Sequence, residues 1–209
     1  MFSTSIDEVA DKLVVEGFGP NLLQMGFKWN KKRRFQKKVE ECTLELNVHL
    51  RKIPGQEAGY LEICPGFAYH ELEKLAAELK GETPRKGWPT AAANIGNLKL
   101  KRDYVEWPIT TTTDIVALGE FICSYIQDYA LPFWDEFSSI RGLVDGYEKE
   151  DPRLTLAGNS YRWRMAAAYC LIGNKDHARN VLDNWNKDRG RPPQAVLEQA
   201  INMISEMSL

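Results

Sequence analysis

The sequence predicts an α+β protein: an antiparallel sheet of about five or six strands packed by helices, followed by an all-helical C-terminal cap. Two patterns in the chain predict this class. Apolar and polar side chains alternate between residues 42 and 50, and apolar side chains recur at helical spacing in several other segments. We expect a sheet domain over residues 1–145 and a helical subdomain over residues 146–209.

The alternation between residues 42 and 50 has the two-residue period of a strand with one buried face. A basic strand, residues 34–40, precedes it, and a second apolar alternation through Leu61 and Ile63 follows a Pro54-Gly55 turn. These segments indicate an antiparallel meander. Residues 95–98 and 104–107 are expected to add two short strands. The buried face of the central strand would carry Cys42, Leu44, Leu46, Val48 and Leu50, and its polar face Thr43, Glu45, Asn47 and His49.

Helices are predicted by caps and apolar stripes. Ser5 and Glu8 form a capping-box pattern before a stripe through Val14, which Gly17, Gly19 and Pro20 are expected to interrupt. Three further helices of this domain follow from the same signals. They are expected over residues 71–80, from Asp114 to about Tyr129, and from Leu131 through Ile140.

Residues 144–152 are rich in carboxylates and contain a glycine, so we expect an acidic linker there. Beyond it, residues 161–185 resemble a single tetratricopeptide-type helix pair, with Gly173 in the turn and Ala178 where the helices approach. This pair is expected to serve as a helical cap or, alternatively, as a docking surface. The docking surface would involve Tyr161, Arg162, Trp163 and Arg164.

Composition excludes several classes of protein. The chain has 209 residues, is 44% hydrophobic and has a formal net charge of −2, which indicates a folded protein without a global attraction to nucleic acid. No apolar run is long enough to span a bilayer, and residues 1–7 lack a secretion-signal layout. We therefore expect a cytoplasmic protein with no membrane partner. Its four cysteines have no Cys-x-x-Cys spacing and are expected to be reduced, buried thiols.

The strongest charge cluster is a basic hairpin, residues 28–38, in which seven of eleven residues are lysine or arginine, interleaved with Trp29 and Phe35. Basic residues among aromatic ones can neutralise phosphates and stack on bases, which favours nucleic-acid binding. The other interpretation is a solvated hairpin or a protein-docking surface, because lysines also protect an edge strand from pairing.

No catalytic or cofactor motif is present. The serine-hydrolase, dinucleotide and P-loop patterns are absent, and no histidine has a metal-ligand spacing, so the sequence predicts no cofactor and no metal. The best acid/base group that can be built is His49 with Glu45 on the same face and Glu62 on the facing strand. A hydrolase with this polar sheet-face site is one alternative function.

Several short motifs resemble a family of uncharacterised bacterial domains. The resemblance covers about residues 5–145, and the family brings no assigned catalytic residues to this chain. It has the character of immunity proteins, which occlude a cognate toxin. The motifs are Met25-Gly-Phe-Lys28, the basic hairpin with Phe35, Ile95-Gly-Asn-Leu98, Tyr104-Val-Glu-Trp107 and Leu131-Pro-Phe133.

The leading functional hypothesis is therefore a non-enzymatic protein-binding module, a bacterial immunity or adaptor protein whose partner is a protein such as a toxin encoded nearby. A nucleic-acid-binding accessory protein that uses the basic hairpin is the other alternative. Charged clusters would dock a partner surface of opposite sign and speed the encounter. The residues expected to bind the partner are Lys31, Lys32, Arg33, Arg34, Asp145, Glu148, Glu150 and Asp151.

Overall fold

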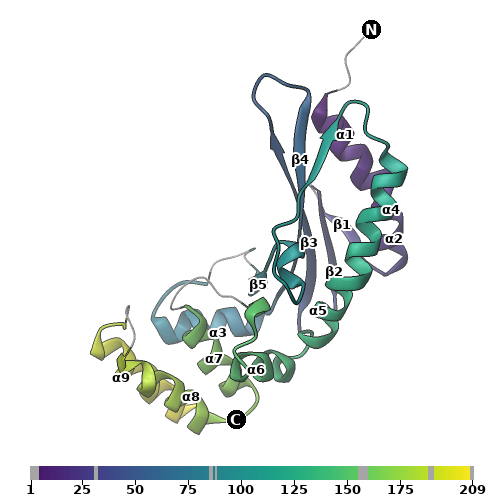
Figure 1. The fold of residues 1–209 in the computed structure, drawn as a ribbon. Helices are drawn as coiled ribbons and strands as arrows, with labels where there is room; N and C mark the ends of the chain where they lie inside the picture. Colours follow the sequence, from purple (N-terminus) through teal and green to yellow (C-terminus); the bar gives the residue numbers. More distant parts are fainter. Residues whose placement is uncertain are drawn as a thin grey trace. The chain divides into compact units, whose positions relative to one another are not determined.

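A computed structural model describes residues 5–30, 33–84, 87, 89–154, 160–187 and 191–207 (Figure 1). Contacts within the chain divide it into two compact units. The sheet unit comprises Met1–Phe67 and Ala92–Asp135, and the helical unit comprises Ala68–Ala91 and Glu136–Leu209. The helical unit thus takes in an earlier segment and begins its second segment before the boundary expected at residue 145. The α+β class is confirmed.

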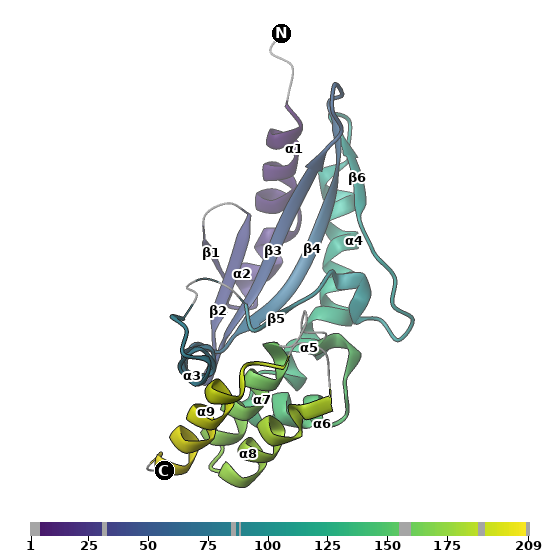
Figure 2. The same cartoon turned by 90° about the vertical axis from the view of Figure 1, so that its left-hand side faces the viewer.

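Within the described residues, the sheet has six strands in the order β1-β2-β3-β4-β5, with β6 also paired to β4. Antiparallel registers place Trp29 opposite Phe35, Phe35 opposite Leu46, and Leu61 opposite Trp107. The expected basic hairpin and meander are confirmed, as Figure 2 shows for β2, β3 and β4. The strands are β1 Lys28–Asn30, β2 Arg34–Lys38, β3 Thr43–Lys52, β4 Ala58–Ala68, β5 Ala91–Ala92 and β6 Trp107–Thr110.

Strand β3 buries the face that the alternation predicts. Leu44, Leu46 and Val48 are buried, while His49 is exposed. Glu45 is an exception, because it lies on the polar face and is nevertheless buried. One face of the sheet therefore supplies the core, and the other carries polar groups.

The first helical run is longer than predicted. The capping box of Ser5 and Glu8 is confirmed and starts α1 Ile6–Lys12, which continues without a break as the π-helix η1 Leu13–Phe18 and as α2 Gly19–Gln24. The prediction that the glycines and Pro20 interrupt this helix was wrong. Pro20 lies just after the π-helix, where the run changes from one hydrogen-bonding pattern to another. Gly26, with φ of 85°, follows the end of the run.

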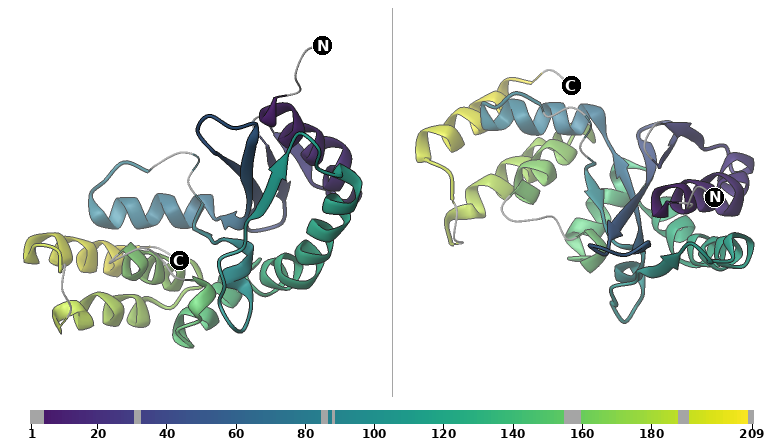
Figure 3. Two further views of the ribbon diagram at one scale, coloured as in Figure 1. Left: turned by 45° about the horizontal axis from the view of Figure 1, so that its top comes forward. Right: turned by 90° about the horizontal axis from the view of Figure 1, so that it is seen from above.

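A second helical run packs beside the first. Asp114 caps α4 Ile115–Tyr125, as predicted, and η3 Ile126–Ala130 and α5 Leu131–Glu136 follow. In Figures 1 and 3, α1 and α4 lie next to each other on the same face of the sheet. The helices approach closely where two glycines meet, because a Cβ atom built on Gly119 would lie 2.6 Å from the Cα atom of Gly17.

The strand expected at residues 95–98 is instead a 3-10 helix, η2 Ile95–Leu98, and of residues 104–107 only Trp107 lies in β6. The cause is the buried side chain of Asn94. Its Oδ1 atom accepts hydrogen bonds from the amides of Gly96 and Val105, and its Nδ2 atom donates to the carbonyl of Val105. A side chain thus satisfies backbone groups that a strand ladder would otherwise pair.

The helical unit contains α3 His70–Lys80, α6 Ile140–Glu148, η4 Pro152–Leu154, α7 Ser160–Leu171, α8 Lys175–Asp183, η5 Asn184–Lys187 and α9 Gln194–Glu206. Helix α3 ends at Gly81 (φ of 70°), as predicted. The helix pair α7 and α8 is also present, with Gly173 (φ of 83°) between the helices and Ala178 fully buried. Its tetratricopeptide character remains a prediction.

The prediction of an acidic linker was wrong. Asp145 and Glu148 belong to α6, whose other side buries Leu143, Val144 and Tyr147. Two of the carboxylates that indicated a linker, Asp145 and Glu148, therefore lie on the solvent-facing side of an amphipathic helix. Of the expected acidic residues, Glu150 and Asp151 follow its end.

All four cysteines are free thiols. Cys42, Cys123 and Cys170 are buried, as predicted, whereas Cys64 is half-buried on the polar side of β4. Burial raises the pKa of the Cys170 thiol to about 11. A thiol with such a pKa is almost wholly protonated at neutral pH, so it behaves as a packing residue.

Candidate partner-binding site

The two described arginines of the basic cluster make ion pairs within the sheet unit. Arg33 lies 2.6 Å from the Asp11 carboxylate and 3.3 Å from that of Asp7, both on α1. The carboxylate of Asp7 also pairs with Lys52. The hydrogen bond from Lys52 and the bonds from Arg33 lower the pKa of Asp7. Helix α1 therefore neutralises part of the charge of the hairpin.

Arg34 makes a more buried pair. Its guanidinium donates to the carboxylate of Glu45, whose side chain is 3% exposed and also accepts a 2.9 Å hydrogen bond from Gln36. Within the described residues, the Oε2 atom of Glu45 and the Nε atom of Arg34 have no hydrogen-bond partner. Lys31 and Lys32, also expected to bind a partner, lie outside the described residues. The described arginines of this cluster thus stabilise the fold.

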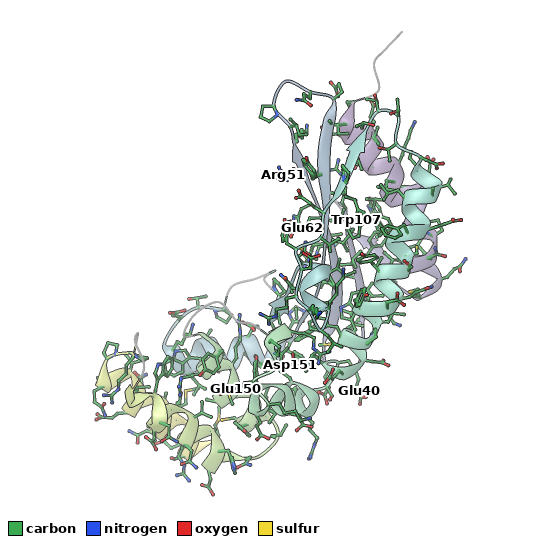
Figure 4. All side chains as sticks on the ribbon, in the orientation of Figure 1. Glu40, Arg51, Glu62, Trp107, Glu150 and Asp151 are labelled. Atoms are coloured by element: carbon green, nitrogen blue, oxygen red, sulfur yellow. The ribbon has the colours of Figure 1, made fainter. Side chains whose placement is uncertain are left out.

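The polar sheet face carries the three residues of the hydrolase hypothesis. His49 is exposed, Glu45 is held by Arg34 and Gln36, and Glu62 accepts hydrogen bonds from Cys64 and Asn94, each at 3.2 Å. Figure 4 shows Glu62 on the sheet. Both carboxylates are thus engaged by neighbouring groups, which leaves the hydrolase a hypothesis without added support.

The helical unit holds a pocket of about 610 Å³. Its volume is within the range of roughly 300–1,000 Å³ typical of ligand sites. The pocket brings together three residues that the sequence singled out, Glu148, Glu150 and Asp151, whereas Asp145 is exposed on α6 and does not line it. The described lining residues are Gly146, Tyr147, Glu148, Glu150, Asp151, Pro152, Leu154, Tyr161, Arg162, Met165, His177, Asn180, Val181 and Asn184.

Helix packing positions Glu148 at the end of α6. The hydroxyl of Tyr169 on α7 donates to the Glu148 carboxylate, and the ring of Tyr169 lies 5.3 Å from that of His177 on α8. Burial, followed by the hydrogen bond and charge of Glu148, raises the pKa of Tyr169. Tyr169 therefore remains a neutral donor at physiological pH and connects the three helices.

Asp151 is fixed by an arginine. The Nε atom of Arg153 lies 3.0 Å from one carboxylate oxygen of Asp151, and its Nη2 atom lies 2.6 Å from the other. Glu136 accepts a further bond from the same guanidinium, which also stacks 4.9 Å from the ring centre of Phe137. The hydrogen bonds to Asp151 and Glu136 raise the pKa of Arg153. Asp151 is thus held rigidly, and Arg153 offsets part of its charge.

Glu150 differs from the other two carboxylates. It is exposed, and its side chain makes no hydrogen bond or ion pair with another described residue. Its backbone has φ of 52°, and amides of Glu150 and Asp151 bond to the carbonyls of Tyr147 and Gly146 at 3.1 and 2.8 Å. Glu150 therefore follows the end of α6 in the left-handed backbone conformation that glycine usually adopts at this position. Figure 4 labels Glu150 and Asp151.

One residue of the pocket lining, Tyr147, has a buried hydroxyl without a partner among the described residues. Tyr147 is 8% exposed, and its hydroxyl makes no hydrogen bond with the described part of the chain. Burial raises the pKa of Tyr147, so its hydroxyl keeps its proton. Buried donors are bonded in the great majority of cases. The charges that act on this hydroxyl are those of Arg164 and Glu73, which do not line the pocket.

The docking surface expected at residues 161–164 divides between two roles. Tyr161 and Arg162 line the pocket. Trp163 is buried, with its ring 5.2 Å from that of Trp185, and Arg164 forms a two-bond pair with Glu73 at 2.7 and 3.0 Å. Only the first two residues are therefore placed to meet a ligand.

Sequence reasoning missed the wall of the pocket that α8 and η5 supply. This wall consists of His177, Asn180, Val181 and Asn184. Their spacing of three, one and three residues places them on one helical face, but a polar helical face usually indicates contact with solvent. The one usable signal for this wall in the sequence is the apolar residue Val181 among polar neighbours on that helical face.

Comparison of the chain with protein-family models, with curated protein sequences and with solved structures returned no match. The resemblance to bacterial immunity-like domains therefore stays a prediction. Among the described helices, none combines the length and apolar character needed to cross a bilayer.

Proposed function

We propose that the chain is a non-enzymatic protein-binding module, a bacterial immunity or adaptor protein that binds and occludes a partner protein. The observation that supports this proposal is the pocket of the helical unit. It joins Glu148, Glu150 and Asp151 to the aromatic residue Tyr161. Carboxylates beside apolar and aromatic groups provide both a steering field for a basic partner and surface to bury.

The ion pairs of two of the seven basic residues in the hairpin favour a protein partner over nucleic acid. Arg33 and Arg34 are both engaged by carboxylates of the sheet unit. Binding to phosphates would have to compete with these pairs. Each arginine that stays paired with its carboxylate neutralises one phosphate fewer. We therefore place the partner surface on the pocket.

Growth rescue tests the immunity form of the proposal. The chain is coexpressed with a toxin encoded by an adjacent gene, alongside Glu150→Lys and a control, Glu78→Lys. Glu78 is an exposed glutamate of α3 that does not line the pocket, so it undergoes the same charge change elsewhere on the unit. We expect the wild type and the control to restore growth and Glu150→Lys to restore it poorly. A toxin that neither binds the chain nor is neutralised by it would reject the immunity form.

A further inference from the structure

The described lining of the pocket has an excess of negative charge, which Arg153 reduces from outside the lining through its pair with Asp151. It contains three carboxylates, Glu148, Glu150 and Asp151, and one guanidinium, Arg162. Arg162 already lies over two rings, 5.4 Å from the ring centre of Tyr161 and 5.8 Å from that of Trp185. A partly enclosed site with this balance attracts cations, because its walls reduce screening by solvent.

The three carboxylates are not equally available. Glu148 accepts from Tyr169, and Asp151 is held by Arg153, whereas the Glu150 side chain makes no bond to a described residue. An incoming cation can therefore pair directly with Glu150. Glu148 adds to the attraction from a fixed position, whereas the charge of Asp151 is largely offset by Arg153.

The other lining residues fit a side chain that has both an apolar stem and a charged end. Met165, Val181 and Leu154 provide apolar surface beside the carboxylates. Arginine and lysine bury their methylene stems on apolar surface and keep their charged ends at polar groups. Arginine suits the site better, since its planar fork pairs with a carboxylate through two hydrogen bonds.

Two further side chains fit the backbone of a peptide. Asn180 and Asn184 lie one helical turn apart, are exposed and make no side-chain hydrogen bond with a described residue. Each amide offers a donor and an acceptor, which is what an extended peptide backbone requires.

We propose that the pocket binds an arginine side chain carried by an extended segment of the partner protein, with its guanidinium at Glu150 and its stem against Met165 and Val181. This inference rests on the proposed protein-binding function and specifies the chemistry of the partner. The segment is basic and exposed in the partner before binding.

The test uses the full chain, labelled with ¹⁵N, and a blocked tripeptide, acetyl-Gly-Arg-Gly-amide, as the probe. The matched probe replaces arginine by citrulline, which keeps the shape and removes the charge. NMR titration follows backbone amides and the side-chain amides of Asn180 and Asn184. We expect saturable shifts confined to the pocket and binding at least about fivefold weaker for the citrulline probe, as expected for one partly exposed charge pair.

Two variants localise the effect. Glu150→Gln removes the available charge with little change in size and should weaken binding of the arginine probe about fivefold, while Glu78→Gln should leave it unchanged. Equal binding of the two probes, no saturable shift, or equal binding by both variants would overturn the inference. Tighter binding of free L-arginine than of the tripeptide would also overturn it, because the ligand would then be a small molecule.

The two proposals fail separately. If the arginine probe does not bind while the chain still captures a partner protein, the protein-binding function stands and its pocket chemistry is wrong. If the probe binds as described but no partner protein is neutralised or captured, the arginine site stands and the proposed function is wrong.

Discussion

The hydroxyl of Tyr169 donates a hydrogen bond to the carboxylate of Glu148, so the middle of the helix pair is joined to the end of α6. The ring of Tyr169 is buried, while Glu148 is exposed at the pocket. One hydrogen bond therefore holds a carboxylate of the candidate site in place from the interior of the unit.

Replacing Tyr169 by phenylalanine should destabilise the chain by about 1 kcal/mol, since a hydrogen bond to a charged but exposed group is lost and the ring is retained. Urea unfolding at neutral pH measures this change. Tyr161→Phe is the matched control, because no hydrogen bond to a described residue involves its hydroxyl, and we expect it to change stability by less than about 0.5 kcal/mol. Equal losses in the two variants would contradict the assigned role of Tyr169.

The raised pKa of Tyr169 makes stability sensitive to alkaline pH. Burial raises this pKa above the unfolded value of about 10, so above that pH the folded state binds the proton more tightly than the unfolded state. The contribution is complete below about pH 10 and is lost as the pH rises further. Thermal unfolding should therefore show a steeper alkaline loss for the wild type than for Tyr169→Phe. Parallel pH profiles would show that Tyr169 titrates normally.

Neighbouring arginines of the basic hairpin should differ in their effects. Arg34→Ala leaves the buried Glu45 carboxylate without its cation and should cost about 3 kcal/mol, as expected when one partner of a buried pair is removed. Arg33→Ala breaks pairs with the half-exposed Asp7 and the exposed Asp11 and should cost less than about 1 kcal/mol. Denaturant titration of both variants distinguishes them, and a larger loss for Arg33→Ala would reverse the assignment.

The contact between Gly17 and Gly119 should tolerate no added methyl group. An alanine Cβ atom at position 119 would lie 2.6 Å from the backbone of Gly17, so Gly119→Ala should destabilise the sheet unit by about 1–3 kcal/mol through overpacking. Val116→Ala, at an exposed position of the same helix, serves as the control. It should change stability by less than about 0.5 kcal/mol. A neutral Gly119→Ala would mean that the two helices separate easily.

Local patterns were sufficient to predict much of the sheet unit. The alternation through Leu44, Leu46 and Val48 and the caps at Ser5 and Asp114 act over a few residues, and each lies where it was expected. The segment after Asn94 could not be predicted in this way. Its backbone bonds a side chain, and that competition depends on the fold around it.

The candidate site, too, could be predicted only in part from local patterns. The acidic residues could be identified by charge, but the burial of Leu143 and Tyr147 makes their segment a helix instead of a linker. His177 and Asn180 had no signal, because a polar side of a helix looks the same in sequence whether it meets solvent or lines a pocket.

Partner capture tests the central claim most directly. Tagged wild type, Glu150→Lys and Glu78→Lys are used to capture material from the cells of origin, washed at about 0.3 M salt, where charge contacts are strongly screened, with and without nuclease. Mass spectrometry identifies what is retained. The account predicts one dominant protein that survives nuclease, is held by the wild type and Glu78→Lys, and is depleted with Glu150→Lys. Material that disappears after nuclease, or a partner held equally by all three chains, would contradict it.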